Sequence, residues 1–300
     1  MNQPESTTVY KTMPVAEFPQ RIELELVSDC NLKCVYCPRH FVNDLTGYLD
    51  FDLFKRLIDE MTPYPGITLV LHRRGESLMH PQFVEMCEYV KGKFKEIQIA
   101  TNVTPLNKKK ALAIIESMHF ISFSIDTPKR FDITRLPAKY ESVENKILEF
   151  LELNDNRIQT QVSMVKTAES PAEDVAWFKE KWKDKVSRVR IYQEHSTDGN
   201  FGSIVGGRFP RKPCMMPKYE MLIYCDGKTG RCNHDWDGPP MGDVTVNTIR
   251  EIWMGDTYAD LREQHRSLDI TDPVCSKCDS WYPELGVQGT GETLESISGS

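Results

Sequence analysis

Residues 28–39 read Ser-Asp-Cys-Asn-Leu-Lys-Cys-Val-Tyr-Cys-Pro-Arg and directly follow an alternating apolar run over residues 21–27. Within this stretch Cys30, Cys34 and Cys37 have the spacing Cys-x3-Cys-x2-Cys. Three thiolates this close in sequence can hold three corners of a cubane iron–sulfur cluster. No fourth cysteine lies nearby, so one iron would keep an open position for a ligand that is not protein. An open metal position is typical of a reactive site rather than a structural one.

The same three positions also fit one face of a helix, because they lie at i, i+4 and i+7, and free cysteine is a common buried apolar residue. The flanking residues favour a loop instead. Ser28, Asp29 and Asn31 are turn and cap formers, and Pro38 would break a helix that ran through the third cysteine. We therefore interpret the stretch as a metal-binding loop.

The spacing, together with Asn31, Tyr36 and Pro38, resembles the cluster loop of the radical S-adenosylmethionine (SAM) enzymes. In that family the open iron chelates the amino and carboxylate groups of SAM. The resemblance implies a [4Fe-4S] cluster held by the three cysteines, SAM as cofactor, and a 5′-deoxyadenosyl radical that abstracts a hydrogen atom from an unactivated C–H bond. Tyr36 matches the aromatic position whose backbone contacts the adenine.

Composition narrows the class of protein. The chain has 300 residues, of which 40% are hydrophobic and 27% charged, as in an ordinary soluble globular protein. A net charge of −7 argues against non-specific binding to nucleic acid. We find no apolar run long enough for a membrane span and no signal-peptide core near the N-terminus. Nine cysteines without such a signal favour metal ligation over disulfides, so we expect a cytoplasmic protein.

Strand-like and helix-like segments alternate after an irregular lead-in over residues 1–20. Six short segments are rich in β-branched or aromatic residues and are predicted strands: 22–27, 67–72, 96–100, 120–125, 160–165 and 188–192. Five segments have helical periodicity: 52–61, 81–91, 108–117, 142–153 and 171–183. This alternation predicts an α/β fold of right-handed parallel β/α units. Six strands are too few for a closed eight-stranded barrel, and the resembled family has a partial (β/α)6 TIM-like barrel, here expected over residues 21–200.

The segment His-Arg-Arg-Gly-Glu-Ser-Leu-Met-His-Pro over residues 72–81 follows the second predicted strand. It resembles the Gly-Gly-Glu-Pro-Leu segment of the radical SAM family, which binds the SAM amino group. Glu76 is retained, Arg74 replaces the first glycine and Ser77 replaces the proline. The resemblance assigns Glu76 to the SAM site, and the Arg74 side chain must find room near the cofactor. A solvated loop is the alternative.

Two more strand ends carry residues that resemble SAM contacts. Asn102 belongs to Thr-Asn-Val, similar to the family's Thr-Asn-Gly with Val103 in place of glycine. Ser124 and Asp126 match residues that reach the SAM ribose or carboxylate. Simple alternation along a strand would also explain Ser122 and Ser124 as one ordinary polar face.

A second set of cysteines lies near the C-terminus: Cys214, Cys232, Cys275 and Cys278. The pattern Cys-x12-Gly-x4-Cys followed by Cys-x2-Cys can close one four-coordinate site, for which structural zinc is an alternative. Behind a radical SAM loop, the layout resembles the auxiliary-cluster "Twitch" module, the shortened relative of SPASM. The resemblance implies a second [4Fe-4S] cluster with four protein ligands. No cysteine follows the fourth one, so we predict a single auxiliary cluster.

The boundaries of this module follow from composition. Residues 201–213, rich in glycine and proline, are a predicted linker, and residues 214–282 are the predicted cluster module. Residues 283–300 are polar and rich in glycine and serine, and we predict a disordered tail.

A cluster with four protein ligands leaves no position for substrate, so we interpret it as an electron carrier. That predicts dehydrogenation of a small-molecule substrate, a sugar, cyclitol or derivative, as in the resembled Twitch dehydrogenase that acts on an aminocyclitol alcohol. The resemblance also implies a flavodoxin or ferredoxin-type electron donor. A base is needed, and the candidates by position alone are Glu194, His195, Arg190 and Tyr192; surface or linker roles explain them as well.

Other outcomes stay open. Cys225 could return a hydrogen atom to a substrate radical, which would make the protein an epimerase, or it could be a buried structural cysteine; Cys87 lies on an apolar helix face and is predicted core. A ribosomal-peptide maturase is another alternative, although a lead-in of twenty residues is short for a leader-binding domain. The alternative that is not an enzyme is a binding protein stabilised by zinc. Basic residues near the expected barrel mouth could meet an anionic group or simply lie on the surface: Arg73, Arg74, Arg208, Arg211 and Lys212.

Overall fold

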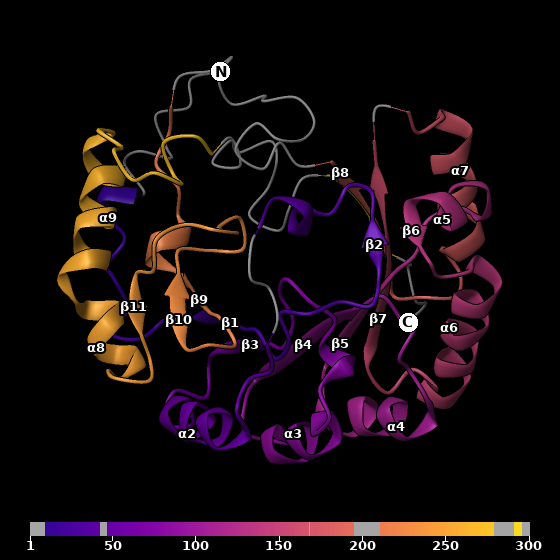
Figure 1. Ribbon diagram of the computed structural model, residues 1–300, viewed down its shortest axis with the longest axis horizontal. Helices are drawn as coiled ribbons and strands as arrows, with labels where there is room; N and C mark the ends of the chain where they lie inside the picture. Colours follow the sequence, from indigo (N-terminus) through magenta and orange to yellow (C-terminus); the bar gives the residue numbers. More distant parts are fainter. Residues whose placement is uncertain (1–9, 43–46, 168, 195–210, 279–290, 296–300) are drawn as a thin grey trace.

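The computed structural model describes residues 10–42, 47–167, 169–194, 211–278 and 291–295, the last of these by backbone alone. A curved ten-stranded sheet in the order β11-β10-β9-β1-β3-β4-β5-β7-β8-β12 runs through the molecule (Figure 1). Its central six strands pair in parallel, each with the next in that order. They are β1 (Arg21–Leu24), β3 (Thr68–Val70), β4 (Glu96–Thr101), β5 (Phe120–Ser124), β7 (Gln159–Lys166) and β8 (Arg188–Gln193). The predicted α/β barrel of parallel strands is confirmed.

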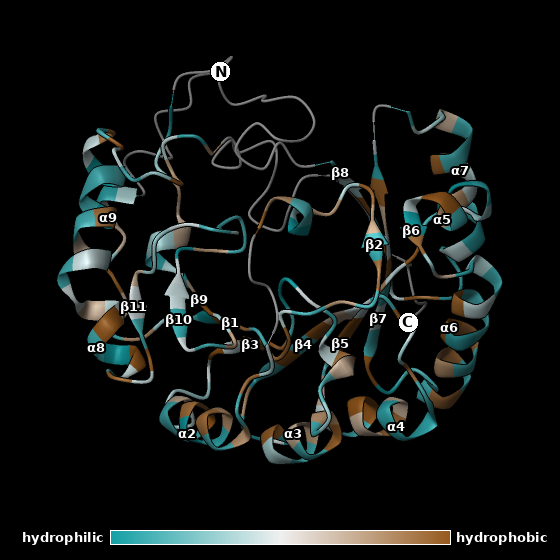
Figure 2. Cartoon of the chain, in the orientation of Figure 1, coloured by the Kyte–Doolittle hydropathy of each residue, from teal (hydrophilic) through white to brown (hydrophobic). Residues whose placement is uncertain are grey.

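Helices line the outer side of this sheet (Figure 1). They are α2 (Phe51–Met61), α3 (Phe83–Val90), α4 (Lys108–Ser117), α5 (Pro128–Thr134), α6 (Tyr140–Asn154) and α7 (Ala172–Trp182). In Figure 2 each of them carries both hydrophobic and hydrophilic residues, as expected for helices that pack one side on a sheet. All but α5 were predicted, with ends within two residues of the expected ones. The Asp50 side chain starts α2 by accepting the N–H groups of Asp52 and Leu53.

The two faces of the sheet differ sharply in polarity. Apolar residues at every second strand position are buried in the core with the helices: Ile22, Leu24, Ile97, Ile99, Ile121, Phe123, Val162, Met164, Val189 and Ile191. Because side chains alternate along a strand, the intervening residues turn to the inner face of the barrel. Those residues are mostly polar: Arg21, Glu23, Gln98, Ser122, Ser124, Gln161, Ser163 and Arg188.

The cysteine-rich C-terminal region continues the barrel sheet. Strand β9 (Glu220–Ile223) pairs in parallel with β1, and β10 (Lys228–Gly230) and β11 (Gly242–Asp243) extend the sheet in antiparallel fashion. Helices α8 (Ile249–Met254) and α9 (Asp256–Ser267) follow. The sequence pattern predicted a separate module here. The pairing of β9 with β1 was not predicted, because cysteine spacing does not reveal which strand a later segment joins.

One part of the predicted disordered tail is ordered. Strand β12 (Gly291–Glu295) pairs antiparallel with β8, from Gly291 opposite Tyr192 to Glu295 opposite Arg188. This corrects the expectation for these five residues. An open sheet edge offers unpaired backbone groups to any extended segment, so pairing there does not need a strongly strand-forming sequence. The predicted linker lies outside the described residues except for its last three positions. No helix in the described ranges is both long and apolar enough to cross a bilayer.

The packing of the barrel wall predicts a large effect of truncation at Phe123. This side chain is fully buried, and its ring lies 5.1 Å from that of Phe150 on α6 at an interplanar angle of 70°. Phe123→Ala should lower the free energy of unfolding by about 3–5 kcal/mol, because it leaves a cavity in the core. Denaturant unfolding of the anaerobically prepared protein measures this. Val246→Ala, at a side chain 78% exposed, is the control and should change stability by less than about 0.5 kcal/mol.

Candidate active site

The first cysteine loop leaves the carboxyl end of β1, the edge of a parallel β/α fold where active sites form. Its strand β2 (Lys33–Cys34) pairs antiparallel with β6 (Arg135–Leu136), and the Cys37 N–H donates to the Cys34 carbonyl at 3.0 Å. Burial is the main cause that raises the pKa of all three loop thiols, Cys30, Cys34 and Cys37, and each also feels a neighbouring one. The structure therefore brings the predicted triad together.

Asn102 lies against the first cysteine of this loop. Its Nδ2 donates to Asn31 Oδ1 at 3.0 Å and lies 3.6 Å from Cys30 Sγ. Its Oδ1 accepts hydrogen bonds from the Thr104 backbone and hydroxyl. The end of β4 is thus bound directly to the cluster loop. Contact of Asn102 with SAM stays a prediction.

The next residue, Val103, occupies the position of the family's glycine and keeps a glycine-like backbone. Its φ is +72°, in the left-handed region that a β-branched residue rarely adopts. The side chain is fully buried, and the backbone N–H donates to Thr101 Oγ1 at 2.9 Å. Burial and this hydrogen bond hold a conformation that costs on the order of 1–3 kcal/mol.

Glu76 is a buried connection between the ends of β3 and β4. Its carboxylate accepts hydrogen bonds from Thr101 Oγ1 at 2.8 Å, the Asn102 N–H at 2.6 Å and the Leu78 N–H at 3.1 Å. Burial raises the pKa of Glu76. The Glu76 side chain therefore positions residues 72–81, which we call the SAM-motif segment. A direct contact of Glu76 with the SAM amino group stays a prediction.

The glycine before Glu76 allows this segment to lie directly on the cluster loop. A Cβ at Gly75 would lie 2.2 Å from the Asp29 carbonyl oxygen and 2.3 Å from that of Val27. The Glu76 N–H donates to the same Asp29 carbonyl at 2.8 Å. Only a residue without a side chain fits at this backbone–backbone contact.

Asp126 anchors the cluster loop from the end of β5. Its carboxylate accepts from Tyr36 Oη at 2.7 Å, Thr134 Oγ1 at 2.8 Å and Arg135 Nε at 3.0 Å, and the Val165 N–H lies 3.4 Å away. Asp126 and Arg135 form a buried ion pair. Tyr36 and Asp126 thus have a positioning role that the sequence did not indicate, and their contacts with SAM stay predictions. Ser124, the last residue of β5, is half-buried, and its SAM contact also stays a prediction.

The four C-terminal cysteines also converge. Burial is the main cause that raises the pKa of Cys214 to about 12, and the Cys278 thiol adds to it. Burial likewise raises the pKa of Cys232, which feels the other three thiols of the set, and that of Cys275. No disulfide links any of the chain's cysteines.

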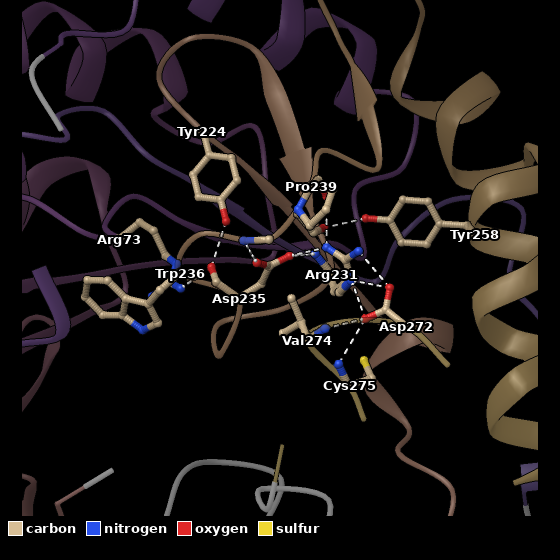
Figure 3. A network of polar contacts seen from close by, with 12 residues as sticks. Arg73, Tyr224, Arg231, Asp235, Trp236, Pro239, Tyr258, Asp272, Val274 and Cys275 are labelled. Carbon is tan, nitrogen blue, oxygen red and sulfur yellow. Dashed lines mark hydrogen bonds and ion pairs between the residues drawn. The ribbon is translucent and has the colours of Figure 1, made fainter. Parts of the chain in front are cut away.

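Polar residues that the sequence analysis did not assign to this second site lie beside its cysteines, and Figure 3 shows those around Cys275. Asp272 accepts the N–H groups of Val274 and Cys275 at 3.0 and 2.9 Å and forms an ion pair with Arg231 at 2.7 Å. Arg211 donates to the carbonyls of Cys275 and Cys278, both at 2.9 Å. The only sequence signal was the position of Asp272 just before the Cys-x2-Cys turn, where aspartate often caps a turn. Arg211 was predicted only as a basic residue near the mouth.

Both sets suit iron–sulfur clusters in their donor chemistry. Buried thiols that resist ionisation become thiolates when metal cations bind, because the cation offsets the cost of the charge. Cys30, Cys34 and Cys37 would hold the SAM-binding cluster, and the four C-terminal cysteines the auxiliary one. No group of three or more His, Cys, Asp or Glu side chains in the described ranges is arranged to hold a single metal ion.

A model of the radical SAM superfamily matches residues 24–185, just over half of the chain. The chain belongs to the radical SAM superfamily. A second family model, the SPASM iron-sulfur cluster-binding domain, matches residues 214–279. These matches support SAM and [4Fe-4S] clusters as the cofactors of this radical SAM protein and decide against zinc in the C-terminal domain.

Two curated relatives share part of this sequence. The tungsten-containing aldehyde ferredoxin oxidoreductase cofactor-modifying protein of Pyrococcus furiosus is 31% identical over 105 residues, which are 34% of this chain and 30% of that protein. The antilisterial bacteriocin subtilosin biosynthesis protein AlbA of Bacillus subtilis is 31% identical over 103 residues, 34% of this chain and 22% of that protein. The matched region thus spans less than a third of either relative.

Solved structures share the fold more completely. BtrN in complex with AdoMet and 2-DOIA has a TM-score of 0.60 at 19% identity, and the match covers 87% of this chain and 92% of that one. SuiB of Streptococcus suis bound to S-adenosylmethionine has a TM-score of 0.67 at 12% identity, covering 91% and 75%. At these identities the likeness establishes the fold alone.

Two arginines join the SAM-motif segment to the C-terminal cluster-binding region, residues 214–279, which we call the auxiliary domain. Arg74 forms a two-pronged ion pair with Glu25, with Nε and Nη2 each 2.8 Å from a carboxylate oxygen, and its guanidinium lies 3.9 Å from the Tyr224 ring centroid. Arg73 Nη2 donates to the Asp235 carbonyl at 2.7 Å (Figure 3). The Arg74 side chain, for which the sequence left no obvious room, thus points to the auxiliary domain. Arg208 lies outside the described residues.

Cys225 and Cys87 differ in their surroundings. Cys87 is buried in the barrel core, as predicted. Cys225 lies just beyond β9, and its thiol contacts Ser28 and Gly47 beside the cluster loop. Burial, with the carboxylate of Glu25, raises the pKa of Cys225 to about 11. The thiol is therefore protonated at neutral pH.

The predicted bases lie around the end of β8. Glu194 follows the strand and donates its N–H to the Lys166 carbonyl at 3.0 Å. The Arg190 guanidinium lies 5.2 Å from the Tyr192 ring centroid, and both side chains are half-buried. His195 lies outside the described residues. The assignment of a base stays a prediction.

Substitution at Gly75 tests the contact between the SAM-motif segment and the cluster loop. Gly75→Ala should destabilise the protein by about 3 kcal/mol, because the methyl group overlaps two backbone carbonyls that cannot move independently. It should also reduce the iron retained after reconstitution. Gly66→Ala is the matched control, since a Cβ there meets nothing within 4 Å. Equal stability and iron content in the two variants would contradict this contact.

Proposed function

We propose that this radical SAM enzyme dehydrogenates a small polar substrate, a sugar, cyclitol or derivative. When bound, SAM and the two clusters supply a 5′-deoxyadenosyl radical that removes a hydrogen atom and an acceptor for the second electron. The Cys30 loop and the C-terminal cysteines would hold the clusters. For SAM we propose contacts from Tyr36, Glu76, Asn102, Ser124 and Asp126, and as reductant a flavodoxin or ferredoxin-type donor.

The polar inner face of the barrel is the observation that carries this proposal. Arg21 Nη1 donates to Gln98 Oε1 at 3.2 Å, and Gln161 Nε2 donates to Ser122 Oγ at 2.8 Å. These groups bond one another inside the barrel, and a polar interior of this kind suits a substrate rich in hydroxyl groups better than an apolar interior would. A substrate bound inside the barrel would be shielded from water-borne quenchers of a carbon radical.

The auxiliary domain supports an oxidative outcome. Four converging cysteine ligands leave no position for substrate on that cluster, so its role would be electron transfer. The fold likeness to BtrN, bound to AdoMet and 2-DOIA, is consistent with a small ligand in such a barrel.

Incubation with SAM, reductant and candidate sugars or cyclitols tests the proposal. The anaerobically purified protein should be brown, with about eight irons from two cubanes. Dehydrogenation should give a product lighter by two hydrogen atoms, in equal amount to 5′-deoxyadenosine, by mass spectrometry. A colourless protein without iron, or 5′-deoxyadenosine without oxidised product from any candidate, would refute it.

Epimerisation is a second candidate, favoured by the position of Cys225. A thiol that returns a hydrogen atom must be protonated and must face the radical. The high pKa of Cys225 meets the first need, and its place beside Ser28 at the barrel mouth is compatible with the second.

Deuterated water distinguishes the two outcomes. An epimerase should give an isomer that carries one solvent deuterium, and Cys225→Ala should abolish its formation while 5′-deoxyadenosine still forms. Cys87→Ala is the matched control, because it removes the same atom from the core. For a dehydrogenase, we expect no deuterated isomer and similar product yields from both variants.

A ribosomal-peptide maturase is a third candidate. AlbA takes its name from the biosynthesis of a bacteriocin, and SuiB has been solved with its precursor peptide. Peptides therefore belong among the substrates assayed, and a modified peptide would overturn the small-molecule proposal.

A further inference from the structure

We propose that Arg73 binds an anionic group of the substrate, a carboxylate or phosphate, at the barrel mouth. This inference rests on the proposed function and narrows its substrate class from polar to acidic. It singles out one of the five basic residues that the sequence places near the mouth.

Arg73 occupies the region where a substrate would meet both cofactor sites. It lies beyond the carboxyl end of β3, directly before the Arg74-Gly75-Glu76 segment that packs on the cluster loop. On its other side lies the loop that follows Cys232, through Asp235 and Trp236 (Figure 3).

The Arg73 guanidinium is held in place but keeps unused donors. Nη2 donates to the Asp235 carbonyl, and the group lies 4.6 Å from the Trp236 ring centroid. Nε is buried without an acceptor, and within the described part of the chain no hydrogen bond is found from Nη1 of this half-buried residue. A planar guanidinium fixed by a ring and a carbonyl is well prepared to bind a carboxylate or phosphate.

The carboxylates near Arg73 form ion pairs with other arginines. Glu25 pairs with Arg74 at 2.8 Å and Asp235 with Arg231 at 2.8 Å. Glu23 and Glu220 both pair with Arg21, at 3.3 and 3.2 Å. The positive charge of Arg73 acts on Glu220 and lowers its pKa, against the larger effect of burial. No carboxylate in the described ranges lies within ion-pair distance of Arg73.

The other basic candidates have prior partners or lie outside the described residues. Arg74 is committed to Glu25, and Arg211 to the carbonyls of two cluster cysteines. A bound carboxylate or phosphate would accept charge-assisted hydrogen bonds from Arg73 donors that the described residues leave unused. Arg73 is therefore the cation best placed to recognise the substrate.

Inorganic phosphate is the probe for this site. In the reconstituted, reduced, SAM-bound protein the clusters would be paramagnetic, so the ³¹P resonance of phosphate bound near them at Arg73 should broaden. Arg73→Gln should weaken phosphate binding about tenfold or more, as expected for loss of a charge-assisted contact. Arg73→Lys should retain part of it. Arg250→Gln, at an exposed arginine paired with Glu17, is the matched control and should behave as the wild type.

Iron content and the cluster EPR spectrum verify that each variant is folded. Equal broadening in Arg73→Gln and the wild type, or none in the wild type, would overturn the proposal. So would a tenfold loss of SAM affinity in Arg73→Gln with phosphate displaced by SAM, since the anion would then be the SAM carboxylate. Arg73-dependent phosphate binding without any dehydrogenation would refute the proposed reaction and leave the anion site standing.

Discussion

The ion pair between Asp126 and Arg135 is the interaction on which the first cofactor site depends. It lies almost wholly out of water, so either charge would be expensive without the other. Asp126 also accepts from Tyr36, inside the cysteine loop, and Arg135 belongs to the strand that pairs with Cys34. One buried carboxylate thereby connects the cysteine loop to the end of β5, close to the three thiols.

A second set of polar contacts joins this site to the auxiliary domain. Glu25 at the end of β1 receives Arg74 from the neighbouring SAM-motif segment, and Arg74 packs on Tyr224 beyond β9. Since β9 pairs directly with β1, both cofactor sites are built on one continuous sheet. Their separation is therefore fixed by strand pairing rather than by a flexible linker, which is the geometry that electron transfer between them would need.

Much of the barrel could be predicted from sequence because its signals are local. The strands alternate between buried apolar and inner polar residues, and α4 has the predicted limits of 108–117. Strand β9 and the tail strand β12 were missed. Their pairing depends on which edge of the sheet is open, and no local pattern records that.

By itself the sequence determined the radical SAM family and the β/α barrel, and it predicted the cysteines of both sites, because ligand spacing and strand periodicity are properties of short segments. Tertiary structure alone decided what the remaining side chains do. The Glu76 carboxylate accepts the Asn102 N–H and that of Asp126 accepts the Tyr36 hydroxyl, while their contacts with SAM stay predictions. Arg74 is paired with Glu25, and Arg73 keeps unused donors. The reason is physical: the role of a charged group depends on which opposite charges the fold brings within reach, and those come from distant parts of the chain.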